Sequence, residues 1–256
     1  MDEAVLYETR GPVAIITINR PERRNALGLA VRDGLRAAFE CFEADPALAV
    51  AILTGAGDKA FSAGMDLKEA AETGIKIPPR GPGGFPVIGD DLAVTKPTIA
   101  AVNGVAIAGG WLMVQMCDLC VAAKHAVFAI TEAKVGRGTP WAAPLAGMLP
   151  QRVTMELLLT GEPIGARRLY ELGYVNRVVP AEALLGTALD LAERIAANAP
   201  LTVRACRALV HLSAEMGRTA ALRAADDLFA PVYLSEDAQE GPRAFAEKRK
   251  PVWKGR

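Results

Sequence analysis

Short, continuously apolar runs limit this chain to a small set of folds. They cover residues 50–54, 98–102 and 119–123, and each is followed by a turn rich in Gly, Asn or Lys. A further strand candidate at 13–18 follows the turn pair Gly11-Pro12. A strand without polar alternation is buried on both faces, which is typical of parallel sheets covered by helices. The pattern therefore predicts a largely parallel, layered α/β core.

The second half of the chain has a different pattern. A helix is predicted over residues 28–44 and a strand over 175–179, which ends at Pro180. Beyond Pro180 four segments have helical patterns, separated by Pro, Gly and Ser: 182–198, 201–215, 218–234 and 236–249. We therefore expect an α/β core over residues 1–198 and a helical region over residues 199–256.

Charge and hydropathy argue against several classes of protein. The 256 residues contain 29 Lys and Arg and 29 Asp and Glu, so bulk charge does not favour a nucleic-acid partner. No apolar run approaches the roughly 20 residues of a membrane span. Met1-Asp2-Glu3 is acidic and lacks the apolar core of a secretory signal. We therefore expect a cytoplasmic protein with no membrane partner.

Cysteine and histidine do not form a recognisable metal or nucleophile site. Cys117 and Cys120 have metal-ligand spacing, but their surroundings are apolar and favour two small core residues. The only histidines, His125 and His211, have no Ser or Cys partner in a nucleophile motif. We expect no bound metal.

Two loops that follow core strands are candidates for a ligand site. In the first, residues 55–67, small residues at 62–64 allow a ligand to approach the backbone, and Asp66 can cap the next helix. In the second, residues 103–111, Gly109 opens an apolar helix. An ordinary strand-to-helix loop and close helix packing are the respective alternatives. If the loops converge, their N–H groups form an oxyanion hole, where the enolate of a thioester would be stabilised.

Glu132 is the candidate acid or base. It follows the apolar run 128–130, so we expect it to end a strand and to face inward or into a cleft. A carboxyl group in such a place has a raised pKa and can exchange protons near neutral pH. The alternative is a solvated Glu, or one paired with Arg137.

Residues 75–89 are too rich in Pro and Gly for regular structure. A loop of this length in a compact domain is usually a functional lid or a disordered segment, and we favour a substrate-side loop. Its apolar residues are expected to shape a pocket: Ile75, Ile77, Phe85 and Val87. Trp111 and Trp141 are expected either to narrow this pocket or to belong to the core.

Several motifs together resemble the enoyl-CoA hydratase/isomerase (crotonase) superfamily over about residues 5–253. Each motif is short, but their order and spacing are specific. They are NRP (19–21), NAL (25–27), AFSAGMDL (60–67), KPTIAAVNG (96–104), AGG (108–110), CD (117–118), LLTG (158–161), LGYVNRVV (172–179) and FAEKRKP (245–251).

The resemblance implies a crotonase-like spiral of ββα units with a helical C-terminal trimerisation region. It implies trimers, often paired into hexamers, and an acyl thioester of coenzyme A as substrate, with no cofactor beyond the CoA that the substrate carries. By position, the oxyanion donors would be the N–H groups of Met65 and Gly109. The loop from Ala63 through Asp66 to Leu67 would line the CoA adenine and pantetheine.

More weakly, the resemblance places three further residues near CoA. Arg24 stands where family members often have a basic residue near the CoA phosphates. Phe245 and Lys248 would reach the CoA of a neighbouring subunit.

The chain departs from the family pattern at Leu112. Typical hydratases have a Glu there, and Glu132 matches only the second of their two glutamates. Leu cannot hold or ionise water, which puts two-carboxylate hydration in doubt. One carboxylate facing a stabilised enolate suits Δ3-Δ2-enoyl-CoA isomerisation. The alternatives are a hydratase or hydratase-lyase with a single glutamate, and a non-catalytic acyl-CoA-binding scaffold.

Overall fold

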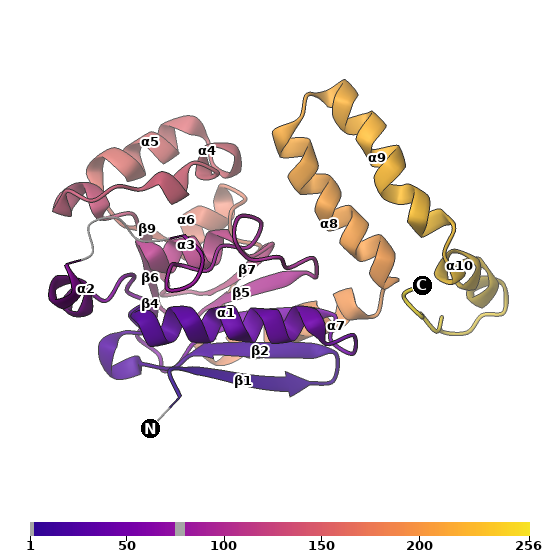
Figure 1. The fold of residues 1–256 in the computed structure, drawn as a ribbon, viewed down its shortest axis with the longest axis horizontal. Coiled ribbons are helices and arrows are strands. Elements are labelled where there is room, and N and C mark those ends of the chain that lie inside the picture. Colours follow the sequence, from indigo (N-terminus) through magenta and orange to yellow (C-terminus); the bar gives the residue numbers. More distant parts are fainter. Residues whose placement is uncertain (1–2, 75–79) are drawn as a thin grey trace.

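The computed structural model describes residues 3–74 and 80–256, and a six-stranded sheet forms its centre (Figure 1). Only the edge pair β1–β2 is antiparallel; every other neighbouring pair is parallel. In spatial order the strands are β1 (Val5–Arg10), β2 (Val13–Ile18), β3 (Val50–Gly55), β5 (Thr98–Val102), β7 (Leu119–Ala123) and β10 (Arg177–Val179). The predicted parallel core is confirmed.

Helices cover both faces of this sheet. Ala51 and Leu53 of β3 belong to the apolar cluster that contains the buried face of α1 (Leu29–Ala44). Val50 and Ile52 of the same strand belong to a second cluster with α7 (Leu184–Ala196). Alternate residues of one strand thus enter two cores, which explains why these strands show no polar alternation.

The chain also forms a second, separate sheet of four strands. Its order is β4 (Ala60–Ser62), β6 (Val105–Ile107), β8 (Val127–Ala129) and β9 (Ile164–Gly165). The chain passes from β3 to β4 to α2 (Leu67–Thr73), and then from β5 to β6 to α3 (Gly109–Gln115). These two successive ββα units place both candidate loops at the ends of neighbouring strands, because β4 pairs with β6.

The other elements are further α-helices and several short 3₁₀ turns. The α-helices are α4 (Leu145–Met148), α5 (Gln151–Thr160), α6 (Ala166–Glu171), α8 (Pro200–Glu215), α9 (Arg218–Tyr233) and α10 (Glu236–Ala246). The 3₁₀ turns are η1 (Pro21–Arg23), η2 (Glu132–Val135), η3 (Pro140–Ala142) and η4 (Ala181–Ala183). In the part of the chain described, no helix is long and apolar enough to cross a bilayer.

Two local expectations need correction, and one strand was not predicted. Glu132 does not end a strand: β8 ends at Ala129, and Glu132 begins η2. The strand predicted over 175–179 is confined to Arg177–Val179. The sequence pattern gave no prediction for β1, because this edge strand is exposed over most of its length and lacks a clear apolar run.

Helices α8 and α9 form an antiparallel pair that projects from the α/β body, and α10 follows at its base (Figure 1). Asp118, directly after the turn that follows α3, holds this arm. Its carboxylate accepts two hydrogen bonds of 2.8 Å from Arg207 Nε on α8 and one of 2.8 Å from the Thr98 N–H. Burial alone would raise the pKa of Asp118, but these donors and His211 lower it below its usual range.

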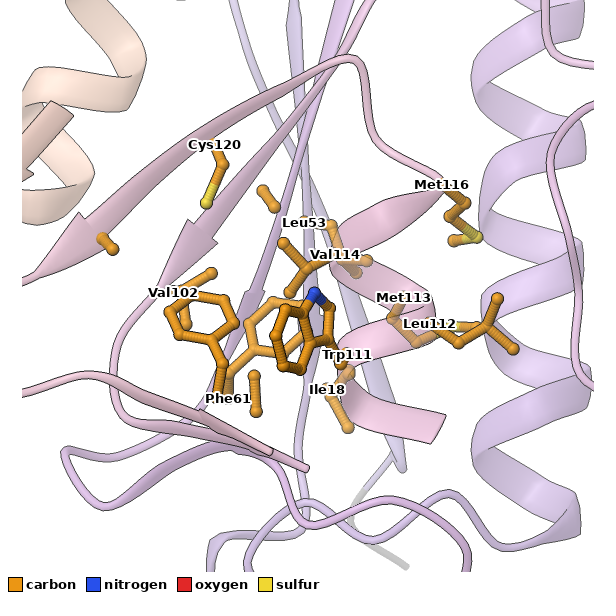
Figure 2. Close-up of a cluster of buried hydrophobic side chains, with 14 of the residues drawn as sticks. Ile18, Leu53, Phe61, Val102, Trp111, Leu112, Met113, Val114, Met116 and Cys120 are labelled. Atoms are coloured by element: carbon orange, nitrogen blue, oxygen red, sulfur yellow. The ribbon is translucent and has the colours of Figure 1, made fainter. Parts of the chain in front are cut away.

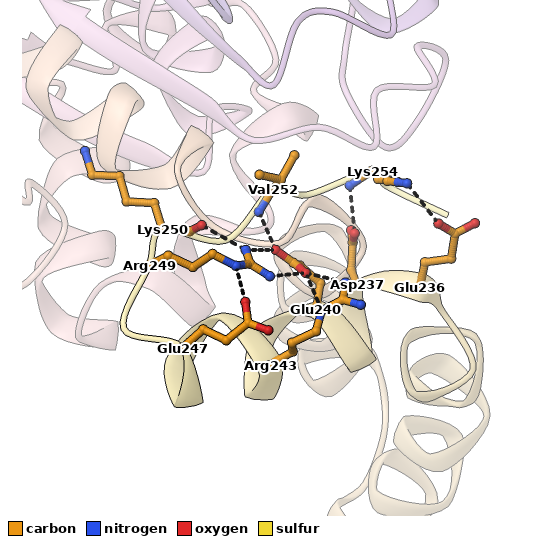
Figure 3. Close-up of polar contacts among 9 residues, drawn as sticks. All are labelled: Glu236, Asp237, Glu240, Arg243, Glu247, Arg249, Lys250, Val252 and Lys254. Atoms are coloured by element: carbon orange, nitrogen blue, oxygen red, sulfur yellow. Dashed lines mark hydrogen bonds and ion pairs between the residues drawn. The ribbon is translucent and has the colours of Figure 1, made fainter.

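A second polar cluster fastens the C-terminal tail to α10 (Figure 3). The Glu240 carboxylate accepts hydrogen bonds from Arg249 and Arg243 and from the Val252 N–H, which lower its pKa. Asp237 accepts from the N–H of Lys254 at 2.7 Å. Residues 247–256 therefore have a defined path although they contain no helix or strand.

Candidate active site

Hydrogen bonds between residues close in sequence fix the loop between β4 and α2. Gly64 has φ +85°, and its N–H donates to Ser62 Oγ at 3.1 Å. Asp66 caps α2 as predicted, with its Oδ1 accepting from the Glu69 N–H at 3.3 Å. Because φ +85° is a left-handed conformation, glycine is the residue that fits position 64 without strain.

The loop between β6 and α3 contains a strained residue. Ala108 has φ +54° and ψ −121°, a conformation that costs a non-glycine residue about 1–3 kcal/mol. Its N–H donates to the Ala129 carbonyl at 2.8 Å, which ties the turn to β8. This turn directs the backbone into α3 at Gly109.

The two loops lie against each other. A Cβ atom placed on Gly64 would be 2.7 Å from the Ile107 carbonyl oxygen and 3.2 Å from the Gly109 amide nitrogen. A Cβ atom on Gly110 would overlap the Ser62 carbonyl oxygen. The approach is therefore possible only because both positions are glycine.

The meeting of these loops leaves two backbone donors without a protein partner. Within residues 3–74 and 80–256, neither the Met65 N–H nor the Gly109 N–H donates a hydrogen bond to the protein. For Gly109 the reason is general, since the first N–H groups of a helix have no acceptor inside it. Two free amides close to each other can stabilise a developing negative charge.

Glu132 is buried and has one side-chain partner among the described residues. It is 8% exposed, and its Oε1 accepts from Trp141 Nε1 at 3.1 Å, while Oε2 is buried without a partner. Burial raises the pKa of the carboxyl, against the smaller lowering effect of the hydrogen bonds. Arg137 contacts it through the backbone only, its N–H donating to the Glu132 carbonyl at 2.9 Å. The alternatives of a solvated or Arg-paired Glu are therefore wrong for this structure.

The segment that carries Glu132 adjoins the two loops. β8, three residues before Glu132, is bonded to Ala108 as described, and Gln115 at the end of α3 donates from Nε2 to the Trp141 carbonyl at 2.9 Å. The turn η3 is thus tied to the helix that Gly109 begins. Gln115 itself is 9% exposed, and its Oε1 has no partner among the described residues.

The start of α3 divides its side chains between two environments. Figure 2 shows Trp111 beside Phe61 and Val102, with Leu112 extending from another side of the helix. Trp111 is fully buried, and its Nε1 donates to the Tyr174 hydroxyl at 2.7 Å. Of the two expectations for Trp111, the structure favours a core residue over one that narrows a pocket. Leu112 is 4% exposed and brings no polar group.

The described part of the Pro- and Gly-rich loop packs onto Gly109. A Cβ atom on Gly109 would be 3.0 Å from Phe85 Cε1, so the ring closes one side of this turn. Arg36 of α1 fixes the loop, donating to the Asp91 carboxylate at 2.6 Å and to the Gly81 carbonyl at 3.0 Å. Val87 packs on the same core. The predictions for Ile75 and Ile77 lie outside the described residues.

Guanidinium groups gather beside the first loop. Arg24 is exposed, and its carbonyl accepts from the Ala63 N–H at 2.9 Å. Arg20 and Arg23 lie 3.2 Å and 3.6 Å from Asp66 Oδ2. Burial would raise the pKa of Asp66, but the Glu69 N–H and these cations lower it. The sequence motifs did not single out Arg20 and Arg23, although three of the five residues at 20–24 are arginines.

Two predicted binding residues are not brought to this site within one chain. Phe245 is 87% exposed on α10, and Lys248 is exposed just beyond it. Figure 1 shows α10 at the opposite end of the molecule from α2. Leu67, by contrast, is exposed at the first loop, where it was expected.

Comparisons with known proteins agree with this architecture. The family model for enoyl-CoA hydratase/isomerase matches residues 8–256. A carnitinyl-CoA dehydratase from Citrobacter koseri is 40% identical over 266 residues, covering 100% of both chains. Crystal structures of enoyl-CoA hydratases from Mycobacterium tuberculosis and Mycobacterium marinum are 40% and 39% identical, each with a TM-score of 0.92 and coverage of 100% of both chains. The predicted α/β fold is confirmed, and the trimerisation role of its helical region stays a prediction.

Substituting Gly64 by Ala is expected to destabilise the chain more than the same change at Gly173. Both glycines have similar backbone angles, φ +85° and +83°, so each Ala variant has a left-handed strain of about 1–2 kcal/mol. Only Gly64 has atoms within 4 Å of the added Cβ, which adds roughly 1–3 kcal/mol of overpacking. Urea unfolding measures both free energies; equal losses would show that the two loops do not need their close approach.

Replacing Glu132 by Gln is expected to raise the melting temperature at pH 8. Because its pKa is raised in the folded state, Glu132 stabilises the fold fully below its ordinary pKa of 4.5 and less as pH rises through the raised value. Because Gln does not ionise, the variant keeps this part of the free energy of unfolding, which is about 1.4 kcal/mol for each unit by which the pKa is raised. Calorimetry from pH 4 to 8 should show a difference that grows with pH, with the exposed Glu162→Gln as control. A Tm below that of the parent at pH 8 would contradict it.

Proposed function

The chain belongs to the enoyl-CoA hydratase/isomerase family. From that premise we propose that it isomerises a 3-enoyl-CoA to a 2-enoyl-CoA by moving a proton from C2 to C4 through a dienolate. The observation that carries the proposal is the pair of free amides, Met65 N–H and Gly109 N–H, in loops that touch. Removing a proton next to a thioester carbonyl places negative charge on that oxygen. Two backbone donors at the oxygen lower the barrier, each typically worth 10²- to 10³-fold in rate.

Glu132 is proposed as the group that carries the proton. Its Oε2 is buried and without a protein partner, and burial raises its pKa toward the range in which a carboxyl group both takes and returns a proton. In this mechanism Oε2 removes a C2 proton from a 3-enoyl-CoA, and the electron pair of that bond forms the dienolate. The resulting carboxylic acid then protonates C4, the double bond moves to C2–C3, and the carboxylate is regenerated.

Leu112 supports isomerisation over hydration by two carboxylates. It stands at the position where the typical hydratases of the family have their first glutamate, and its side chain can neither ionise nor hold a water molecule. Isomerisation needs no water, and one group suffices because the same proton can leave one carbon and join another.

A hydratase with one glutamate is the second candidate. Relatives about 40% identical are named enoyl-CoA hydratase and carnitinyl-CoA dehydratase. These names denote enzymes that add water to an acyl-CoA or remove it. One observation on this chain favours it as well: Gln115 Oε1 is a buried acceptor without a protein partner, one turn after Leu112 on α3. An amide oxygen there can accept a hydrogen bond from water, although it cannot take its proton.

Coenzyme A is proposed to enter along the first loop. Ala63 to Leu67 offer backbone and apolar surface for the adenine and pantetheine, and the exposed Arg24 offers charge for the phosphates. The substrate brings the CoA, so no other cofactor is proposed. The four cysteines are free thiols, which fits the proposed cytoplasmic location.

We also propose that the helical arm mediates trimer formation. Tyr233 and Leu234 are 74% and 87% exposed at the end of α9, and Phe245 is 87% exposed on α10. Exposing such large apolar groups is costly in water, which supports an association surface on this part of the chain. A neighbouring subunit would then receive Phe245 and Lys248 beside its CoA.

Matched 2-enoyl- and 3-enoyl-CoA substrates in ¹⁸O-water test the reaction. Isomerisation converts the 3-enoyl substrate to a product of unchanged mass, whereas hydration adds one labelled water to the 2-enoyl substrate. Glu132→Gln is expected to lower turnover by about 10²- to 10⁴-fold with near-normal ligand binding, while Glu162→Gln keeps full activity. Ligand bound but unchanged by the parent protein would instead identify an acyl-CoA-binding scaffold.

Sedimentation tests the assembly. The parent chain of 27.0 kDa is expected to sediment as three or six copies, and Leu234→Arg is expected to release smaller species because it places a charge in an apolar interface. Leu159→Arg on α5, a leucine of 74% exposure on the body, is the matched control. A parent protein that is monomeric at micromolar concentration would exclude the proposed trimer.

A further inference from the structure

Trp141 is the side chain that contacts the proposed base. It lies in the short turn η3, and its Nε1–H donates to Glu132 Oε1 at 3.1 Å. Among the described residues it is the only side chain that donates to this carboxylate, and Oε2 receives none. The two oxygens of one carboxylate therefore have different environments.

Trp141 is itself held in place from α3. Its carbonyl accepts from Gln115 Nε2 at 2.9 Å, and Gln115 is nine-tenths buried. Pro140 before it fixes one backbone angle, and the Ala142 N–H closes the turn on the Thr139 carbonyl at 3.0 Å. The indole is thus attached to the helix whose first residue is Gly109.

The chemistry of indole suits a positioning role. Its N–H is a donor only and does not exchange protons in the pH range of carboxyl groups. Bound to Oε1, it stabilises the ionised carboxylate and fixes the rotation of the group, without competing for the transferred proton. The proton then has a single oxygen, Oε2, to join and leave.

No neighbouring charge substitutes for this contact. On the same segment Lys134 is paired with Glu162 at 2.8 Å, and Arg137 makes no ion pair with Glu132 in the described structure. The helix α5, which packs on η2, carries Arg152 and Glu156, both exposed. The pKa of Glu132 is accordingly set by burial and hydrogen bonds, with no contribution from these charges.

We propose that Trp141, anchored by Gln115, is a positioning residue that occupies Glu132 Oε1 and restricts proton transfer to Oε2. This inference rests on the proposed role of Glu132 as the proton carrier. It assigns a function to a tryptophan that sequence analysis placed only in the pocket wall or the core, and it explains why a single carboxylate suffices to deliver a proton in a defined direction.

The pH dependence of turnover distinguishes this role from a structural one. A hydrogen bond to the charged form lowers a pKa, so Trp141→Phe, which keeps the ring but removes the N–H, should raise the pKa of Glu132. The acid limb of kcat is expected to move up by about one pH unit. On the plateau kcat should fall about tenfold because the carboxylate is free to rotate, with KM changed less than about twofold.

Trp253→Phe is the matched control. Trp253 Nε1 donates to the Ala197 carbonyl at 2.8 Å in the C-terminal region, so the same substitution removes a comparable hydrogen bond far from Glu132. Its pH profile should equal that of the parent protein. An unmoved acid limb in Trp141→Phe, or an equal shift in Trp253→Phe, would overturn the proposal.

A second measurement covers the case in which Trp141→Phe does not fold. Fluorinated tryptophan makes the indole N–H a stronger donor without changing its shape appreciably, so the acid limb should move to lower pH. The other two tryptophans, Trp111 and Trp253, bond elsewhere and should not contribute. An acid limb unchanged by fluorination would overturn the proposal. Full activity in Glu132→Gln would instead remove the proposed function on which it rests.

Discussion

The contact between the backbones at 62–64 and 107–110 is the constraint on which the rest of the site depends. It brings two N–H groups from different ββα units together, and it exists because Gly64 and Gly110 have no side chains to keep the loops apart. The strained turn at Ala108 belongs to the same arrangement. The parallel sheet supports it by ending β4 and β6 side by side, and the buried core keeps those ends fixed.

In the proposed mechanism, different groups around this contact stabilise the charge and transfer the proton. The backbone of the two loops would supply donors that have no pKa in the physiological range, while Glu132 would supply a buried carboxyl group whose pKa is raised by burial. Trp141 and Gln115 connect the two parts through α3. Leu112 on α3 adds no ionisable group, so the proposed reaction is simpler than hydration by two glutamates.

Sequence patterns predicted the parallel strands and the cap at Asp66, because burial on both faces and helix starts leave local signatures. The catalytic role of Glu132 stays a prediction. They did not predict β1, which is an exposed edge strand. They left Trp111 and Trp141 undecided, because aromatic residues look alike in a sequence whether they fill a core or donate to a carboxylate. The clamp between Arg36 and Asp91 was also missed, since ion pairs separated by many residues depend on tertiary packing that periodicity does not encode.

The near absence of antiparallel pairing has a kinetic consequence. Among the described residues, only β1 and β2 pair as a local hairpin, and β9 joins β8 as a second antiparallel pair; each of the other later strands needs a crossover that brings it beside a parallel neighbour. Position 64 contacts 109, 132 contacts 141, and the arm contributes Arg207 to Asp118. During synthesis, therefore, the hairpin and α1 can form early, whereas the arm can dock only after α8 has left the ribosome.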